Sequence, residues 1–446
     1  MNWRAHNFAV LIVLASVQIF ACKCPVVFAQ NPPREKPQLK DFGSSLKRLK
    51  WDAKQNAAVE RKPGDNTAKG SGDRDVVRVE TSLVVSDVLV LDQRGQPVQG
   101  LTQKDFVITE DGKPQQVGML SLGDDARIPR TIVLIMDDSS SQFPFIHTSV
   151  EAATTLVDKL GPRDTMAIVT SEIELLADFT SDKDQLKQTL LALEKRSAPY
   201  YRTPLRQRSR SNVYSALMAT LKEAFDSEDF RPIVILQTDG DDVQMLRNPI
   251  IMPTFSPDVG REQRRENERI VAGLEENIRK YQTEFSLDDV YKAAQKSRAT
   301  IYTITPGFQL LGLSSDEEVA QYAAWHRKIL LSWEPPGRIK EAEAKLSNLS
   351  VVDQRIQAAY AEKMQSALAL LATITGGWAN FLGDPSQADE IYSHILSDMN
   401  RRYIVGYYPT NKEHDGKRRK LGIDVRGHPE YIVMSRKSYF VPEPEQ

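Results

Sequence analysis

The sequence contains only two cysteines, Cys22 and Cys24, and both lie near its start. If this start is removed, no disulfide and no cysteine nucleophile are left in the chain. An excess charge is also missing, because 58 Lys and Arg residues face 60 Asp and Glu residues, for a net charge of −2. This balance argues against broad nucleic-acid binding, and we expect no nucleic-acid partner. With 41% hydrophobic residues the chain can bury a core, and its length suits about two to four domains.

The only long apolar run that approaches a membrane span is N-terminal. Phe8–Ala21 follows the positive charge of Arg4 and precedes the small-residue pattern that ends at Ala29. This predicts a signal peptide over residues 1–29 and an exported protein that is periplasmic, in the cell envelope or secreted. Two alternatives stay open: a lipoprotein signal with lipid on Cys22, and an uncleaved membrane anchor. We expect contact with a membrane only through such an anchor or lipid, if cleavage after Ala29 does not occur.

The two flanks of the chain indicate a small β module. Residues 30–75 are rich in Pro, Lys, Asp, Asn and Gly without a sustained hydrophobic period, which predicts a disordered linker. Residues 76–124 change to short strand-like runs separated by turns such as Asp111-Gly112, typical of an antiparallel β module. Residues 401–441 return to the same pattern, so we expect them to complete this module.

Residues 125–400 alternate between apolar runs and helical patterns. Thr131–Met136 and Ile233–Leu236 are uninterrupted apolar runs, as expected for strands of a parallel sheet whose two faces are both covered by helices. The pattern predicts an α/β class with a doubly wound, mostly parallel sheet of the Rossmann-like kind. Two stretches exceed what such a domain needs, and we expect helical insertions near 243–298 and 314–372.

Oxygen-bearing side chains follow both of these apolar runs. Asp137, Ser139 and Ser141 come directly after the first run, and Asp239 follows the second. Ligands of open parallel sheets bind at the carboxyl ends of strands, where these residues fall. Ser211 precedes a helical segment and is placed to add a hydroxyl from a neighbouring loop. Hard oxygen ligands favour Mg²⁺, or else Mn²⁺ or Ca²⁺, over softer metals.

This order of motifs resembles von Willebrand factor type A (VWA) domains, and more narrowly the VWFA-related domain family described from Acidobacteria. The family's metal-ion-dependent adhesion site (MIDAS) combines DxSxS after the first strand, a threonine in a later loop and an aspartate after a further strand. Ser211 stands at the threonine position, and Ser140 and Gln142 replace a usual glycine and methionine. Further segments that carry the resemblance are Leu101-Thr102, Asp105-Phe106, Glu110–Pro114, Thr375–Gly377 and Tyr403–Pro409.

The resemblance implies that the chain binds another protein or macromolecule through an acidic group held by a divalent cation. The metal ligands carried over from the family are Asp137, Ser139, Ser141, Ser211 and Asp239. A basic loop beside Ser211 is a candidate rim for an acidic partner, formed by Arg202, Arg206, Arg208 and Arg210.

Three other interpretations stay open. The Asp-Ser segment can act as a helix cap without a metal. The protein can also be a structural or assembly factor of the envelope whose degenerate site holds no metal. A metal-dependent hydrolase is the third, although GxSxG, HExxH, Walker A and GxGxxG do not occur in a suitable context. We therefore expect no enzyme.

Overall fold

The computed structural model describes residues 49–52, 57–60, 83–125, 129–197, 211–225, 231–240, 265, 269, 285–334, 336–347, 351–383 and 387–441. The expected signal peptide and most of the expected linker lie outside these residues. The linker prediction is incomplete, because β1 (Leu49–Asp52) and β2 (Ala57–Glu60) pair as an antiparallel hairpin within it. These strands are four residues each, too short to leave a clear hydrophobic period in the sequence.

A six-stranded sheet forms the centre of the α/β domain. Its order is β12-β11-β10-β7-β8-β9, and only the edge strand β9 runs antiparallel. All residues of β7 and β10 are buried, which explains why Ile132–Met136 and Pro232–Leu236 within them are continuously apolar. The bounds of the six strands are β7 Thr131–Met136, β8 Thr165–Thr170, β9 Leu175–Thr180, β10 Pro232–Gln237, β11 Thr300–Pro306 and β12 Ala379–Leu382.

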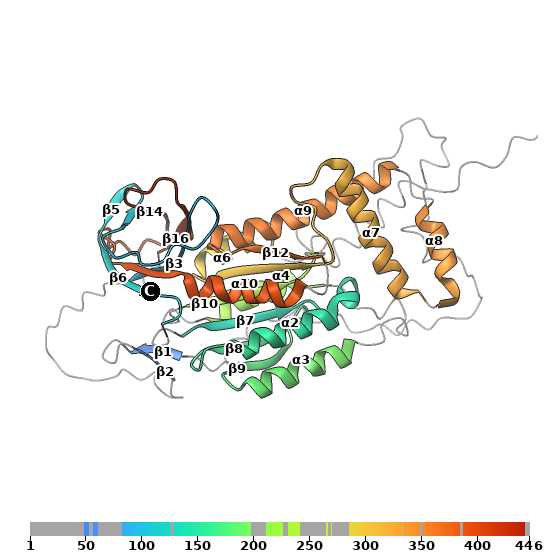
Figure 1. Cartoon of the computed structure of the whole chain (residues 1–446), viewed down its shortest axis with the longest axis horizontal. Coiled ribbons are helices and arrows are strands. Elements are labelled where there is room, and N and C mark those ends of the chain that lie inside the picture. The colour runs from blue at the N-terminus through green and yellow to red at the C-terminus, as the bar shows by residue number, and fades with distance from the viewer. Residues whose placement is uncertain are drawn as a thin grey trace, which may run out of the picture.

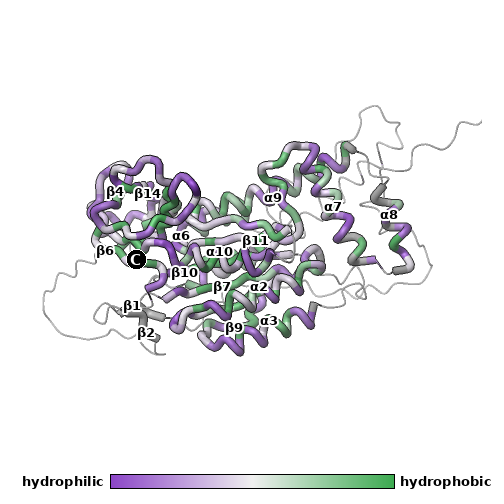
Figure 2. Tube along the Cα trace, in the orientation of Figure 1, coloured by the Kyte–Doolittle hydropathy of each residue, from purple (hydrophilic) through white to green (hydrophobic). Residues whose placement is uncertain are grey.

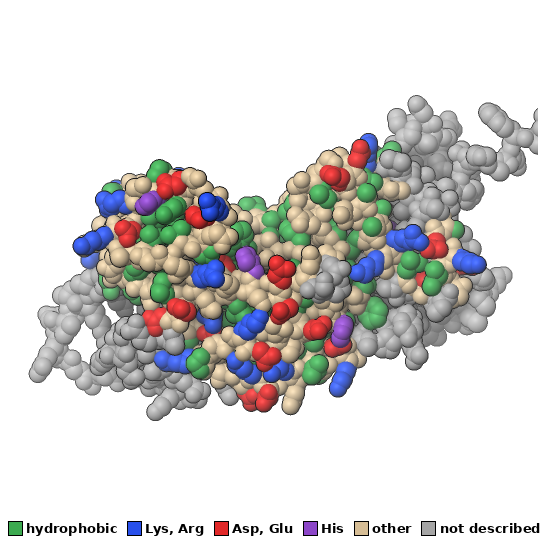
Figure 3. Space-filling view, viewed as in Figure 1, with side chains coloured by type: hydrophobic (Ala, Val, Ile, Leu, Met, Phe, Trp, Pro, Cys, Tyr) green, Lys and Arg blue, Asp and Glu red, His purple; other side chains and the backbone are tan. Residues whose placement is uncertain are grey.

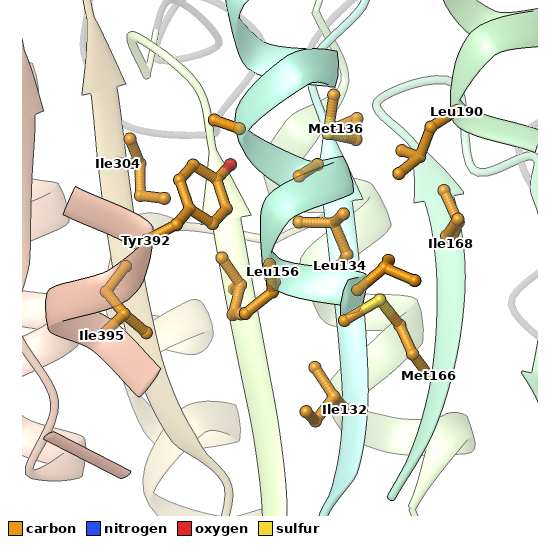
Figure 4. Packing of buried hydrophobic residues seen from close by; sticks show 14 of the residues in the cluster. Ile132, Leu134, Met136, Leu156, Met166, Ile168, Leu190, Ile304, Tyr392 and Ile395 are labelled. Atoms are coloured by element: carbon orange, nitrogen blue, oxygen red, sulfur yellow. The ribbon is translucent and has the colours of Figure 1, made fainter. Parts of the chain in front are cut away.

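Helices cover both faces of this sheet, so the doubly wound fold class is confirmed (Figure 1). One face packs against α2 (Ile146–Asp158), α3 (Lys183–Ser197) and α10 (Ala388–Arg401). Figure 4 shows Leu156 of α2 and Tyr392 of α10 among the sheet residues of this core. The other face packs against α4 (Val213–Ala219), α6 (Leu287–Lys296) and the end of α9 (Val351–Thr375). In Figure 2 the helices show hydrophobic and hydrophilic residues alternating along their length, as expected for helices with one buried face.

The two stretches expected as helical insertions are not insertions over their whole length, because parts of both belong to the core of the α/β domain. α6 lies within 243–298, yet its Val290 and Ala294 are buried in the core on the sheet. In 314–372, α7 (Ser315–Trp333), η7 (Pro336–Arg338), α8 (Ile339–Ser347) and the first half of α9 form a projection that we call the helical arm (Figure 1). The last turns of α9 belong to the domain core. Among the described helices, none combines the length and the apolar character needed to cross a membrane.

The β module consists of two four-stranded antiparallel sheets and lies at one end of the central sheet, opposite the helical arm (Figure 1). The sheet orders are β15-β3-β13-β6 and β16-β14-β4-β5. Val88 and Ile108 from the N-terminal flank share one core with Tyr403 and Ile423 from the C-terminal flank, which confirms a module built from both flanks. The bounds are β3 Val84–Leu91, β4 Phe106–Glu110, β5 Lys113–Gln115, β6 Val117–Leu122, β13 Tyr403–Tyr407, β14 Arg418–Val425, β15 Ile432–Met434 and β16 Ser438–Phe440.

Arg231 joins the β module to the α/β domain. Its side chain is fully buried and ion-pairs with Asp87 of β3, with 3.0 Å between Nη2 and Oδ2. The same guanidinium donates to the carbonyl oxygens of Gly123 at 2.7 Å and Met399 at 3.0 Å. A single side chain thus satisfies three acceptors from separate segments, so the contact between the two parts of the molecule depends on it.

A second buried ion pair predicts a pH dependence of stability. Asp164 accepts hydrogen bonds from Nε of Arg130 at 2.8 Å and from the backbone N–H of Gly161 at 2.8 Å. Burial alone raises the pKa of the Asp164 carboxyl, but these hydrogen bonds and the charge of Arg130 outweigh it and hold the pKa below its ordinary value. The stabilisation is therefore complete above the ordinary carboxyl pKa of about 4 and is lost as the pH falls through the lower native pKa.

We expect the free energy of unfolding to fall with decreasing pH more steeply in the wild type than in Asp164→Asn. Urea unfolding at a series of pH values from about 6 to about 2 measures this difference, because the amide does not titrate in this range. Equal slopes in the two proteins would contradict the assignment.

Candidate metal centre

The candidate site lies where β7 and β10 end side by side. In chain order the six strands have the sequence 3-2-1-4-5-6 across the sheet, read from β9 to β12, so the first and fourth strands are neighbours. The helix α2 after β7 and the helix α6 between β10 and β11 lie on opposite faces of the sheet, as expected where a crevice opens at the carboxyl ends of neighbouring strands. Asp137 directly follows β7, and Asp239 follows β10 after one residue.

Asp137 is the centre of this arrangement. Its side chain accepts the hydroxyl of Ser211 at 2.9 Å and the hydroxyl of Thr238 at 2.6 Å, both at Oδ2. Its Oδ1 accepts the backbone N–H of Ser139 at 3.0 Å. Asp137 is 1% exposed, and a buried carboxylate is stable only with such partners. Three loops that are distant in sequence therefore converge on one carboxylate.

Ser139 and Ser141 follow Asp137 closely in the chain, and their hydroxyl oxygens lie 3.3 Å apart. Ser139 occupies the N-cap position of the 3₁₀ helix η2 (Ser140–Phe145), but its side chain makes no capping hydrogen bond. The helix α2 that follows also lacks a side-chain cap. The interpretation of the Asp-Ser segment as a helix cap is therefore wrong for the serine hydroxyls, which face each other instead.

Thr238 and Gly240 fix the loop that carries Asp239. The Thr238 hydroxyl accepts the backbone N–H of Gly240 at 2.9 Å while it donates to Asp137. Gly240 adopts a φ of +79°, and a Cβ there would lie 3.2 Å from Leu368 of α9, so glycine suits this position on both grounds. Asp239, between them, is buried at 4% exposure.

Asp138, the neighbour of Asp137, has different hydrogen-bond partners. Its Oδ1 accepts the hydroxyl of Ser171 at 3.1 Å, and its Oδ2 pairs with Arg196 of α3 at 2.9 Å. Burial raises the pKa of the Asp138 carboxyl, and the pairing with Arg196 offsets only part of this effect. Asp138 thus holds the loop after β7 against β8 and α3, which leaves Asp137 as the carboxylate that faces the hydroxyl groups.

The structure places Ser139, Ser141 and Ser211 close to Asp137, and Asp239 lies next to Thr238, whose hydroxyl contacts Asp137. Asp137 contacts Ser211 directly, Ser139 through its backbone, and Thr238 next to Asp239, while Ser141 contacts Ser139. The basic rim formed by Arg202, Arg206, Arg208 and Arg210 lies outside the described residues. Thr238 is not among the residues predicted from the sequence, although its position between a buried strand and Asp239 was a usable signal.

The donor set suits a hard cation. Among the described residues, no three His, Cys, Asp or Glu side chains gather where they could hold a metal, so a cation here depends on hydroxyl oxygens as well as carboxylates. Gln142 contacts Ser141, and its amide oxygen is buried without a hydrogen-bond partner in the described part of the chain. Carboxylate, hydroxyl and amide oxygens are ligands that Mg²⁺, Mn²⁺ and Ca²⁺ accept.

The α/β domain is similar to von Willebrand factor type A domains. A VWA protein from Catenulispora acidiphila has a TM-score of 0.33 and 10% identity, over 82% of this chain and 74% of that one. The VWA domain of the pilus tip protein Mfa5 from Porphyromonas gingivalis has a TM-score of 0.31 and 14% identity, over 61% and 95%. No family model and no curated protein matches the chain.

A mussel byssus protein, proximal thread matrix protein 1 with zinc in its MIDAS motif, has a TM-score of 0.29 and 10% identity to this chain. The comparison covers 61% of this chain and 48% of the mussel protein.

Replacing Thr238 by valine is expected to lower the free energy of unfolding by about 1–3 kcal/mol, because Asp137 loses a buried donor and Gly240 loses its acceptor. Urea unfolding measures the loss. The matched control is Thr373→Val on the exposed side of α9, where the hydroxyl bonds only to the Ala369 carbonyl and the change is expected to stay within about 0.5 kcal/mol. Similar losses in both variants would show that Thr238 has no special role.

Proposed function

We propose that this VWA-like protein is exported and binds other macromolecules through a divalent cation held by Asp137, Ser139, Ser141, Ser211 and Asp239. The observation that carries the proposal is that the hydroxyls of Ser211 and Thr238 both donate to Asp137 Oδ2, where β7 and β10 end side by side. The serine hydroxyls of the Asp-Ser segment support it, because they do not cap a helix.

The chemistry of the donors favours recognition over storage of an ion. Hydroxyl ligands bring no formal charge, so a bound cation keeps affinity for a further anionic ligand, such as a carboxylate of the partner. Asp137 and Asp239 supply the charge that holds the ion, and Thr238 positions Asp137. Arg196 keeps Asp138 out of the ligand set by pairing with it.

The mixed distribution of charges on the surface favours recognition by a local site of this kind. On the face in Figure 3, acidic and basic side chains are interspersed rather than gathered by sign. This agrees with the net charge of −2. A partner with an acidic group is therefore expected to be selected by the cation and the residues around it, not by a long-range field.

A cation titration tests the metal site. We expect Mg²⁺, Mn²⁺, Ca²⁺ or Zn²⁺ to raise the melting temperature of the wild type, with about 2.7 kcal/mol gained at 100 times the dissociation constant. EDTA should reverse the effect, and Asp137→Ala and Asp239→Asn should lack it. Zn²⁺ is included because the mussel protein holds zinc at this motif. An unchanged melting temperature with every cation would favour a metal-free structural or assembly factor.

Capture from a cell-envelope fraction tests the partner. The immobilised wild type is expected to retain a protein that EDTA releases and that Asp137→Ala does not retain. Capture that ignores both EDTA and the substitution would instead support binding through other surfaces, such as the helical arm. Turnover of ester or phosphoester substrates that Asp137→Ala abolishes would support the hydrolase and overturn a purely recognition role.

A further inference from the structure

A small polar pocket lies at the junction of the β module and the α/β domain, at the opposite end of the sheet from the candidate metal centre. It has a volume of about 20 Å³, which is enough for one or two water-sized spheres. Ser86 and Asp87 line it from β3, and Arg231 and Arg298 line it from the segments that lead into β10 and β11. Arg436, which follows β15, completes the set used here.

The lining carries more positive than negative charge. Three arginines meet a single carboxylate, and that carboxylate, Asp87, is already engaged by Arg231 through Nη2 at 3.0 Å and Nε at 3.2 Å. The positive charge of Arg298 acts on Arg436 across this space. Burial lowers the pKa of Arg436 to about 10. The charge of Arg298 adds to this effect and the charge of Asp87 opposes it, and Arg436 still carries its charge at neutral pH.

Two of the lining side chains also keep donors without an acceptor. Arg436 is 5% exposed and donates from Nη2 to the Ala299 carbonyl at 3.3 Å. Its Nη1 is buried and has no hydrogen-bond partner among the described residues, and the same holds for the hydroxyl of Ser86. A buried guanidinium group with an unused donor costs free energy unless an anion or an acceptor lies beside it.

We propose that this pocket binds one small monovalent anion of the size of chloride. The anion offsets the charge of Arg436, and it supplies the acceptor that Ser86 and Arg436 lack. The small volume favours a halide over sulfate or phosphate. Because the pocket is lined from both parts of the molecule, the bound anion stabilises the junction between the β module and the α/β domain.

The test compares thermal unfolding in sodium chloride and in sodium gluconate at equal ionic strength, with EDTA present so that the metal centre does not contribute. We expect a saturable rise in melting temperature with chloride and with bromide. Gluconate and sulfate should give no saturable rise, and the gradual stabilisation by excluded sulfate should be the same in the wild type and in Arg436→Met. Crystals soaked in sodium bromide should show an anomalous peak beside Arg436.

Two variants connect the effect to the pocket. Arg436→Met should abolish the chloride effect, and Ser86→Ala, which removes only a hydroxyl, should weaken chloride binding about tenfold. The control Arg355→Met removes an exposed arginine of α9 and should respond to chloride like the wild type. Equal melting of the wild type in both salts, or a chloride effect that persists in Arg436→Met, would overturn the proposal.

Discussion

Replacing Gly377 by alanine is expected to prevent the native fold or to cost more than about 3 kcal/mol of stability. A Cβ at this position would lie 1.9 Å from the carbonyl oxygen of Ile301 and 2.7 Å from its carbonyl carbon. These are backbone atoms of β11, a strand paired on both sides within the central sheet, so they cannot shift without breaking strand pairing. Overpacking of a side chain costs typically about 1–3 kcal/mol, and a clash with fixed backbone costs more.

The measurement is the yield of folded protein and, where it folds, urea unfolding. Gly337→Ala is the matched control, because a Cβ there would have no atom within 4 Å and the φ of Gly337 lies outside the left-handed region. We expect it to change the free energy of unfolding by less than about 0.5 kcal/mol. Wild-type stability of Gly377→Ala would show that β11 and the loop before β12 are not packed as described.

The second large effect is expected from Arg231→Met, with a loss of about 3–5 kcal/mol. Methionine keeps much of the volume of the buried side chain but leaves the Asp87 carboxylate without its ion pair, and the carbonyls of Gly123 and Met399 without a donor. Removing one partner of a buried pair is costly because the other charge stays buried. Because these acceptors come from the β module and from segments beside it, we expect the β module to become protease-sensitive first.

The control is Arg355→Met, which breaks the exposed pair of Arg355 with Asp316 at 3.1 Å. Surface pairs of this kind contribute about 0–1 kcal/mol. Limited proteolysis and urea unfolding of both variants distinguish the two cases. If Arg231→Met unfolds like Arg355→Met and the β module stays resistant, the junction does not depend on Arg231.

The sequence predicted the centre of the molecule better than its edges. Thr131–Met136 and Ile233–Leu236 were recognised as strands because both faces of each are buried, so no polar residue interrupts them. β9 (Leu175–Thr180) was not predicted, because an edge strand with partly buried residues has only a weak alternating pattern. β12 (Ala379–Leu382) was missed for a similar reason, since three of its four residues are only partly buried.

Helix patterns alone also could not separate the helical arm from the core. α9 is a single helix, but Leu368 and Leu371 near its end pack on the sheet, while Val352 and Ile356 near its start are exposed. Hydrophobic residues occur at both ends, so the sequence contains no boundary between them. At the metal centre, Asp137 and Asp239 were predictable from their positions after strands. The hydrogen bond between Thr238 and Asp137 was not predictable, because it depends on the register between the neighbouring strands β7 and β10.

The pairing of strands in the β module affects the order in which the chain can fold during its synthesis. The hydroxyl of Tyr403 bonds to the backbone N–H of Leu101, 302 residues earlier in the chain, and β13 lies between β3 and β6 in one sheet. The first strands of the module therefore keep unpaired edges until β13 has been synthesised. The central sheet is contiguous by comparison and can assemble before them. A chain that stops before residue 401 is expected to retain the central sheet and to expose unpaired edges of β3 and β6, which can pair with other chains and aggregate.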